Sequence, residues 1–118
     1  MFADPEIQLI DHLAPLLDVP VLGGVPEPRP AKFVRVMRTG NKRLSVAHRQ
    51  VQMTVECWDE AGDAAAARLA DQVEELLSDW EEMPASEDGW VSGAVPEVDP
   101  DSGCPRYVLT VAFIQFWD

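Results

Sequence analysis

Cysteine and histidine are scarce in this 118-residue chain, which has two of each. Two cysteines are too few for a disulfide framework, so we expect a reducing compartment. Cys57 lies in an apolar stretch typical of a buried thiol, whereas Cys104 lies in a predicted loop and its exposure stays open. His12 and His48 have no second histidine or cysteine at metal-ligand spacing, so the sequence predicts no metal site.

Long apolar runs are also absent. No segment approaches the ~18 residues needed to cross a bilayer, and the N-terminus MFADPEIQLID lacks the basic start of a secretion signal. We therefore expect a protein made in the cytoplasm that stays soluble and has no membrane partner. Apolar residues make up 47% of the chain and charged residues 25%, which is typical of one globular domain over residues 1–118.

Motifs for catalysis or cofactor binding are missing as well. No serine lies in a nucleophile-elbow pattern, and Gly23-Gly24 does not extend into a dinucleotide or phosphate loop. Residues 99–103, DPDSG, resemble the start of a calcium loop but lack its closing glutamate. A tight turn held by aspartate side chains is the better interpretation. The sequence thus predicts no cofactor and no enzymatic activity.

Basic residues are few, and their placement is the most informative feature of the chain. There are nine against 21 acidic residues, and seven of the nine lie between Arg29 and Arg49, where no acid occurs. The formal charge is therefore about +7 on this segment and −19 on the rest. The seven are Arg29, Lys32, Arg35, Arg38, Lys42, Arg43 and Arg49.

This charge separation favours association between copies of the chain. Molecules with a uniform charge of −12 repel one another, but a basic arm can dock on the acidic body of a neighbour and build a ring or a stack. One alternative is a solvated hairpin paired with acids of its own chain. Another is a nucleic-acid contact, which the acidic body and the lack of an aromatic stacking platform disfavour.

Two helices are predicted. The first begins at Asp4-Pro5-Glu6 and ends or kinks near Ala14, because Pro15 removes a backbone donor. Its apolar face should be Ile7, Ile10, Leu13, Ala14 and Leu17. The second begins between Asp59 and Asp63, ends by Pro84 and is followed by a loop over residues 82–89. Its apolar stripe is Ala66, Leu69, Ala70, Val73, Leu76, Leu77 and Trp80.

The remaining segments have the composition of strands. Alternation of apolar and polar residues over 50–57 is the clearest signal, since it indicates a sheet with one solvated face. Further strands are predicted at 19–22, 32–38, 90–95 and 106–117. We expect 32–38 and 50–57 to form a hairpin with the basic segment TGNKRLS at its tip. The predicted fold is α+β, with a mostly antiparallel sheet of four to five strands and both helices on one face.

Three segments together resemble a known family. They are VPEPRPAKFVRVMRTG (25–40), QMTVECW (52–58) and DPDSGCPRYVLTV (99–111), with the alanine-rich helix between the last two. In this order and spacing the chain is similar, over nearly its whole length, to the small tail terminator (tail completion) proteins of long-tailed phages that infect actinobacteria. One departure is Asn41, where a second glycine is expected; asparagine tolerates the same turn.

The resemblance implies a structural virion protein without enzymatic activity. Such proteins form a ring, typically of six copies, on the end of the finished tail tube, stop tube polymerisation and offer a surface to the head-side connector. They reside at the tail–head junction of the virion, and DNA passes through the ring without specific binding. Because salt bridges alone hold a ring poorly, we expect exposed aromatic residues to contribute. The candidate interface residues are Arg29, Lys32, Arg38, Lys42, Arg43, Arg49, Trp90, Phe116 and Trp117.

Two other functions stay open at this point. One is a different neck component, such as a head-completion or stopper protein, which is similarly small. The other is a small host enzyme or acidic regulator, which would need a cleft that holds His12 or His48 against a carboxylate.

Overall fold

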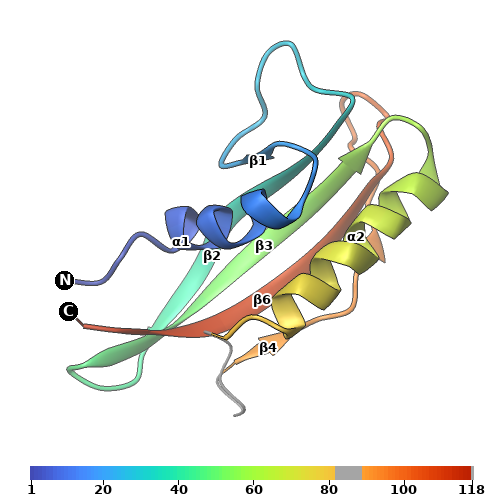
Figure 1. Ribbon diagram of the computed structural model, residues 1–118. Coiled ribbons are helices and arrows are strands. Elements are labelled where there is room, and N and C mark those ends of the chain that lie inside the picture. The colour runs from blue at the N-terminus through green and yellow to red at the C-terminus, as the bar shows by residue number, and fades with distance from the viewer. Residues whose placement is uncertain (82–88, 118) are drawn as a thin grey trace.

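The computed structural model describes residues 1–81 and 89–117 (Figure 1). The elements follow the expected order of helix, strands, helix, strands. They are α1 (Pro5–Leu13), a 3-10 turn η1 (Ala14–Leu16), β1 (Val21–Leu22), β2 (Lys32–Arg43), β3 (His48–Asp59), α2 (Asp63–Ser78), β4 (Trp90–Val91), β5 (Val95–Pro96) and β6 (Arg106–Phe116). The predicted loop at 82–88 lies outside the described residues.

The strands form one sheet in the order β1-β2-β3-β6-β4, with β5 also paired to β6. Only β1 pairs in parallel, and all other pairings are antiparallel. The α+β class predicted from the sequence is confirmed. The described sheet has six strands rather than four or five, because the segment predicted as one strand from Trp90 to Val95 forms two short strands, β4 and β5.

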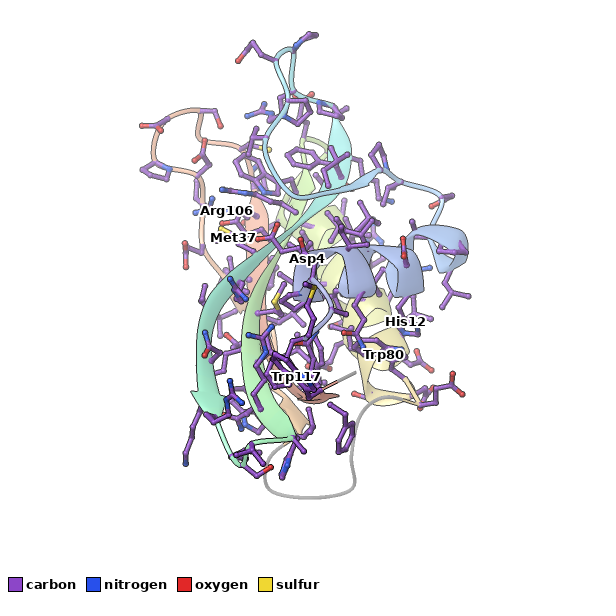
Figure 2. All side chains as sticks on the ribbon, turned by 90° about the vertical axis from the view of Figure 1, so that its left-hand side faces the viewer. Asp4, His12, Met37, Trp80, Arg106 and Trp117 are labelled. Carbon is purple, nitrogen blue, oxygen red and sulfur yellow. The ribbon has the colours of Figure 1, made fainter. Side chains whose placement is uncertain are left out.

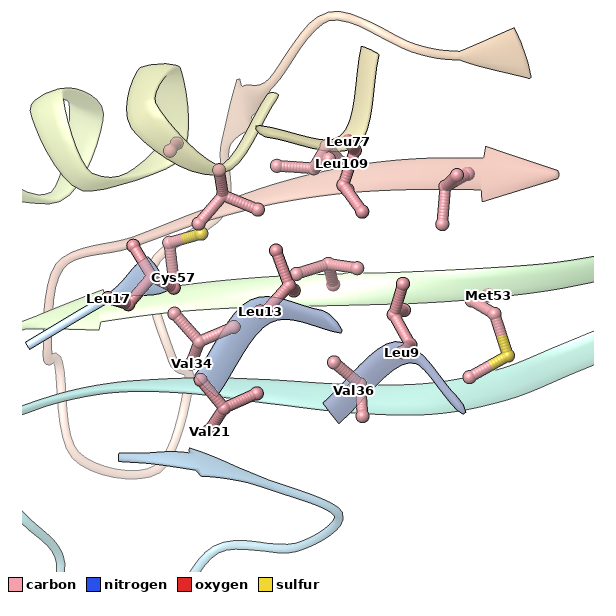
Figure 3. Packing of buried hydrophobic residues seen from close by; sticks show 14 of the residues in the cluster. Leu9, Leu13, Leu17, Val21, Val34, Val36, Met53, Cys57, Leu77 and Leu109 are labelled. Carbon is pink, nitrogen blue, oxygen red and sulfur yellow. The ribbon is translucent and has the colours of Figure 1, made fainter. Parts of the chain in front are cut away.

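The core lies between the sheet and the two helices, which Figure 1 shows on the same side of the sheet. Val51, Met53, Val55 and Cys57 of β3 are fully buried, as their alternation with polar residues predicted. Leu9 and Leu13 of α1 and Leu77 of α2 belong to the same buried cluster (Figure 3). The polar residues between them, Gln50, Gln52 and Thr54, lie on the opposite face.

The predicted apolar face of α1 is confirmed in part. Leu13 and Leu17 are buried and Ile10 packs against the core, but Ile7 is 56% exposed and Ala14 is exposed. The prediction missed Leu9, which is fully buried. Ile7 and Leu9 both fit a helical period, and the packing of Leu9, Leu13 and Leu17 in the core selects Leu9. The predicted ends of α1 are confirmed: Asp4 accepts a 2.9 Å hydrogen bond from the Glu6 amide, and the helix stops at Leu13 before Pro15.

The hairpin of β2 and β3 is longer than predicted. β2 continues to Arg43, with an irregularity in register between Arg38 and Gly40, so most of the expected turn TGNKRLS is strand. The chain reverses at residues 44–47, where the amides of Leu44 and Ser45 donate to the carbonyl oxygen of His48. Pairing with the buried-face pattern of β3 overrides the turn preference of Gly40 and Asn41.

Helix α2 confirms the predicted stripe. Ala66, Leu69, Ala70, Val73 and Leu77 are buried, and Trp80, just beyond the helix, is 7% exposed. Leu76 is partly buried at the edge of the stripe. In the described residues no helix combines the length and apolarity needed to span a bilayer.

Both thiols are shielded, which gives a first prediction. Cys57 is fully buried and Cys104 is 5% exposed. Burial, with a smaller contribution from the Glu56 charge, raises the pKa of Cys57 to about 12, and burial also raises the pKa of Cys104. Because the thiolate is the reactive form, we expect neither cysteine to react with iodoacetamide at pH 8 until guanidinium unfolds the protein. Mass spectrometry counts the adducts, and fast alkylation of the native protein would contradict the assigned burial.

Candidate functional site: the basic hairpin

The seven basic residues between Arg29 and Arg49 fall into two groups along the hairpin. Arg29, Lys32 and Arg35 lie at its open end, and we call them the proximal group. Arg38, Lys42, Arg43 and Arg49 lie toward the turn, and we call them the distal group. In the sequence the seven basic residues form one continuous segment, but in the fold the two groups differ in their ion-pair partners.

Every member of the proximal group forms an ion pair with a carboxylate of its own chain. Arg29 lies 2.9 Å from Glu60, Lys32 lies 3.9 Å from Asp59, and Arg35 lies 3.4 Å from Glu56. The hydrogen bond to Glu60 is the main cause of the raised pKa of Arg29. For these three residues the alternative of pairing within the chain holds, although Arg29 and Lys32 were predicted to lie at an interface between copies.

A buried charge cluster anchors the proximal end. Arg106 of β6 lies 3.3 Å from Glu56 and 2.8 Å from Glu97, and its guanidinium stands 5.0 Å from the ring centre of Trp58. Trp58 in turn donates its indole N–H to Glu56. Glu56 and Arg106 are among the few charged residues that are buried. No local sequence pattern indicates a role for Arg106 in the fold, because its partners come from β3 and from the segment that precedes β6.

The distal group has no such partners. In residues 1–81 and 89–117, no carboxylate lies within 4.0 Å of a charged nitrogen of Arg38, Lys42, Arg43 or Arg49. Arg43 instead donates to the carbonyl oxygen of Val46 at 3.2 Å, and Arg49 donates to the side-chain oxygen of Gln115 at 2.9 Å. Four positive charges therefore lie at one end of the sheet, and none forms an ion pair with the part of the chain that the structure describes.

Register brings the distal arginines close to one another. Arg43 lies directly opposite Arg49, and like charges in this position are destabilising. Arg38 pairs with the buried Met53, so all three arginines lie on the helix-bearing side of the hairpin. Burial lowers the pKa of Arg49, and the charges of Arg38 and Arg43 lower it further.

Phe2, near the N-terminus, contacts two of the distal arginines, Arg43 and Arg49. Its ring centre lies 4.4 Å from the Arg49 guanidinium and 5.1 Å from that of Arg43, within the range of cation–π attraction. Between the N-terminal segment and the hairpin lies a cavity of about 440 Å³, lined by residues 1–6 together with Arg38 and Arg49. Sequence reasoning missed Phe2, because it precedes the first helix and belongs to no periodic pattern.

Two of the three predicted aromatic interface residues lie at this same end. Phe116 is 69% exposed and Trp117 is 56% exposed, and Figure 2 places Trp117 at the opposite end of β6 from Arg106. The Trp117 amide donates to Ala47 at 2.6 Å, and its ring meets the edge of Phe2, so the chain itself holds this terminus. Trp90 of β4 pairs instead with Ala112 and makes no ring contact with this group in the described structure.

The two histidines contact aromatic rings, a hydroxyl and a carbonyl oxygen. His12 stacks on Trp80 at 4.7 Å and contacts the carbonyl oxygen of Leu76 (Figure 2). His48 contacts the Ser45 hydroxyl and stacks on Phe116. Neither histidine forms an ion pair with a described carboxylate, and the described residues contain no cluster of three or more potential metal ligands.

No model of a known protein family matches the chain, and no curated protein matches it.

The buried charge cluster gives a second prediction. Replacing Arg106 by Met leaves the buried Glu56 carboxylate with Arg35 as its remaining cationic partner, beside the indole N–H of Trp58. This loss should lower the free energy of unfolding by about 3–5 kcal/mol. The matched change Arg35→Met should cost about 1 kcal/mol or less, because its pair is more solvated. Urea unfolding measures both. Adding Glu56→Gln to Arg106→Met should recover part of the loss, and equal costs for the two single variants would contradict this account.

Proposed function

We propose that this protein is a structural component that assembles head to tail into a ring and closes the end of a phage tail tube. The observation that carries the proposal is the distal group, four cations that lack an ion pair in the described chain while three neighbours on the same hairpin are all paired. The resemblance to tail terminator proteins supplies the biological setting. Its partners would be copies of itself, the tube protein and the head-side connector.

The energetics require more than charge. An exposed ion pair contributes roughly 0–1 kcal/mol, so four such pairs give a few kcal/mol at most. The Trp117 ring is 56% exposed and meets Phe2, which in turn contacts Arg43 and Arg49. Phe116 is 69% exposed and pairs with His48, so it lies at the same end of the sheet but on the opposite face from Arg49. Burial of these rings against a neighbour would add roughly 25 cal/mol for each Å² of apolar surface removed from water. The distal arginines and the Trp117 ring can therefore form one docking surface, and Phe116 extends it to the other face.

The shape and the charges favour a heterologous contact. The protein is elongated, at 44 × 26 × 26 Å, and its basic surface is confined to one end of the hairpin. The surface that receives it must be a different, acidic one, so each copy has one donor and one acceptor surface. Contacts of this kind close into rings when the rotation between neighbours allows it.

Removal of the distal charges is the first test of this function. Replacing Arg38, Lys42, Arg43 and Arg49 together by Ser should leave the circular dichroism spectrum intact and abolish self-association, measured by sedimentation and native mass spectrometry over a range of concentrations. Tail tubes assembled with this variant should lose control of length in electron micrographs. A wild-type protein that stays monomeric and leaves tube length uncontrolled would end the proposal.

Lys32 and Lys42 offer a matched control on one strand. Both are exposed lysines of β2, but Lys32 is paired with Asp59 and Lys42 has no ion pair in the described chain. Lys42→Ser should weaken association, whereas Lys32→Ser should leave it unchanged. Equal effects would indicate that net charge, rather than the distal position, controls assembly.

Ionic strength separates charge from apolar contact. Raising salt from 0.1 M to 1 M shortens the Debye length from about 10 Å to about 3 Å. We expect the dissociation constant between copies to rise by about tenfold or more over this range, measured by sedimentation equilibrium. The same increase screens the repulsion between bodies of net charge −12, so tighter association at high salt would show that the apolar rings dominate instead.

A further inference from the structure

A row of acids lies on the outer side of α2. Asp71, Glu75 and Asp79 are exposed and recur every four residues, so they follow one line along the helix. Like charges at this spacing destabilise a helix. Asp79 also caps the C-terminal end, where the helix dipole is negative and disfavours a carboxylate. None of the three forms an ion pair with a described residue.

The distal arginines show the same unfavourable crowding with the opposite sign. Arg43 faces Arg49 across the hairpin, and Arg38 borders the same cavity as Arg49. The cavity also contains Asp4, which caps α1, and Glu6, which accepts from the backbone N–H of Arg38. Neither carboxylate forms an ion pair with a distal guanidinium group. Each surface is therefore repulsive within itself and would be relieved by the other.

The two surfaces belong to different copies. The stripe Leu69, Val73 and Leu77 is buried against the sheet. With 3.6 residues per turn, the acids at positions 71, 75 and 79 lie on the opposite side of α2, and all three are exposed. The distal arginines lie at the turn end of the hairpin on the helix-bearing side. Because the β2–β3 hairpin lies on the inner side of the helices, its arginines do not reach the outer side of α2 in the same copy. The arginines of a neighbouring copy can reach it.

We propose that the acidic row of α2 is the surface on which the distal arginines of the next copy dock. This assignment rests on the proposed head-to-tail assembly and names its acceptor surface. Neighbouring acids of the row lie about 6 Å apart, close to the roughly 5 Å between residues opposite each other in a hairpin. The Arg43 and Arg49 guanidinium groups can thus meet successive carboxylates, with the paired hydrogen bonds that arginine forms with such groups.

A second copy fits this cluster better than a nucleic acid does. Binding to phosphates needs many cationic contacts, and the distal group supplies four on a molecule of net charge −12. A phosphate partner would explain the crowding of the distal arginines but not that of the acids on α2. Docking on the carboxylates of a second copy explains the crowding of both surfaces.

Reciprocal charge reversal tests the pairing. Variant A carries Arg38→Glu and Arg43→Glu, and variant B carries Asp71→Lys and Glu75→Lys; all four positions are exposed. Each variant alone should associate at least about tenfold more weakly than wild type, since its two surfaces then have the same sign. An equimolar mixture of A and B should assemble again, because A donates to B and B to A. Circular dichroism confirms that each variant is folded.

A third variant controls for net charge. Variant C carries the two changes of variant A together with Asp11→Lys and Asp18→Lys, two exposed acids outside α2, so its net charge returns to the wild-type value of −12. Because its hairpin end is still acidic, variant C should stay unassembled. Assembly of variant C as strong as that of the mixture of A and B would show that only net charge matters and would overturn the assignment.

The remaining outcomes separate the two proposals. If wild type assembles and the mixture of A and B does not, the acceptor surface is not α2, while head-to-tail assembly stands. If wild type stays monomeric with and without tail tubes, both proposals fail. If wild type binds a 20-base-pair DNA duplex, and A loses this binding while the mixture stays monomeric, the cluster takes phosphates and the assignment to α2 is wrong.

Discussion

The register of β3 between β2 and β6 is the constraint on which the structure depends. Val51, Met53, Val55 and Cys57 must face the helices, and a slip of one residue would turn all of them toward solvent. The same register sets the charges. Glu56 lies opposite Arg35 of β2 and Val108 of β6, and its carboxylate forms an ion pair with the buried Arg106. The same register places Arg43 opposite Arg49. One apolar pattern therefore determines where positive charge is neutralised and where it is not.

The two ends of the hairpin differ because β3 and the residue that follows it supply carboxylates at only one of them. At the open end, Glu56, Asp59 and Glu60 follow directly along β3 and pair with the proximal group. Toward the turn, β3 supplies Gln50, Gln52 and Thr54, which have no charge to offer. The aromatic ring of Phe2 and the amide of Gln115 hold the distal guanidinium groups in place without neutralising them. The result is a fixed patch of positive charge on an acidic protein.

The sequence predicted what depends on local periodicity and missed what depends on contacts between distant segments. Alternation over 50–57 and the stripe of α2 predicted β3 and the second helix because each has one clear apolar face. The face of α1 was ambiguous, since Ile7 and Leu9 both fit a helix and only the sheet selects Leu9. The count of charged residues identified the basic segment. Its division into a proximal group with ion pairs and a distal group without them in the described chain could be seen only from the pairing of β2 with β3. Phe2 and Arg106 act through contacts with residues that are distant in the sequence, and no local pattern predicts such contacts.

Charge crowding of opposite sign on two surfaces gives a physical reason for a closed ring. A like-charge pair on a surface costs only a few tenths of a kcal/mol, which a folded domain stable by about 5–15 kcal/mol tolerates as a monomer. In an open row of copies, one arginine cluster and one acidic row remain crowded at the two ends. Closing the row adds one more interface without bringing in another subunit, and it relieves both ends together. Because each contact is individually weak, this extra interface would favour the proposed closed ring over open rows of the same length.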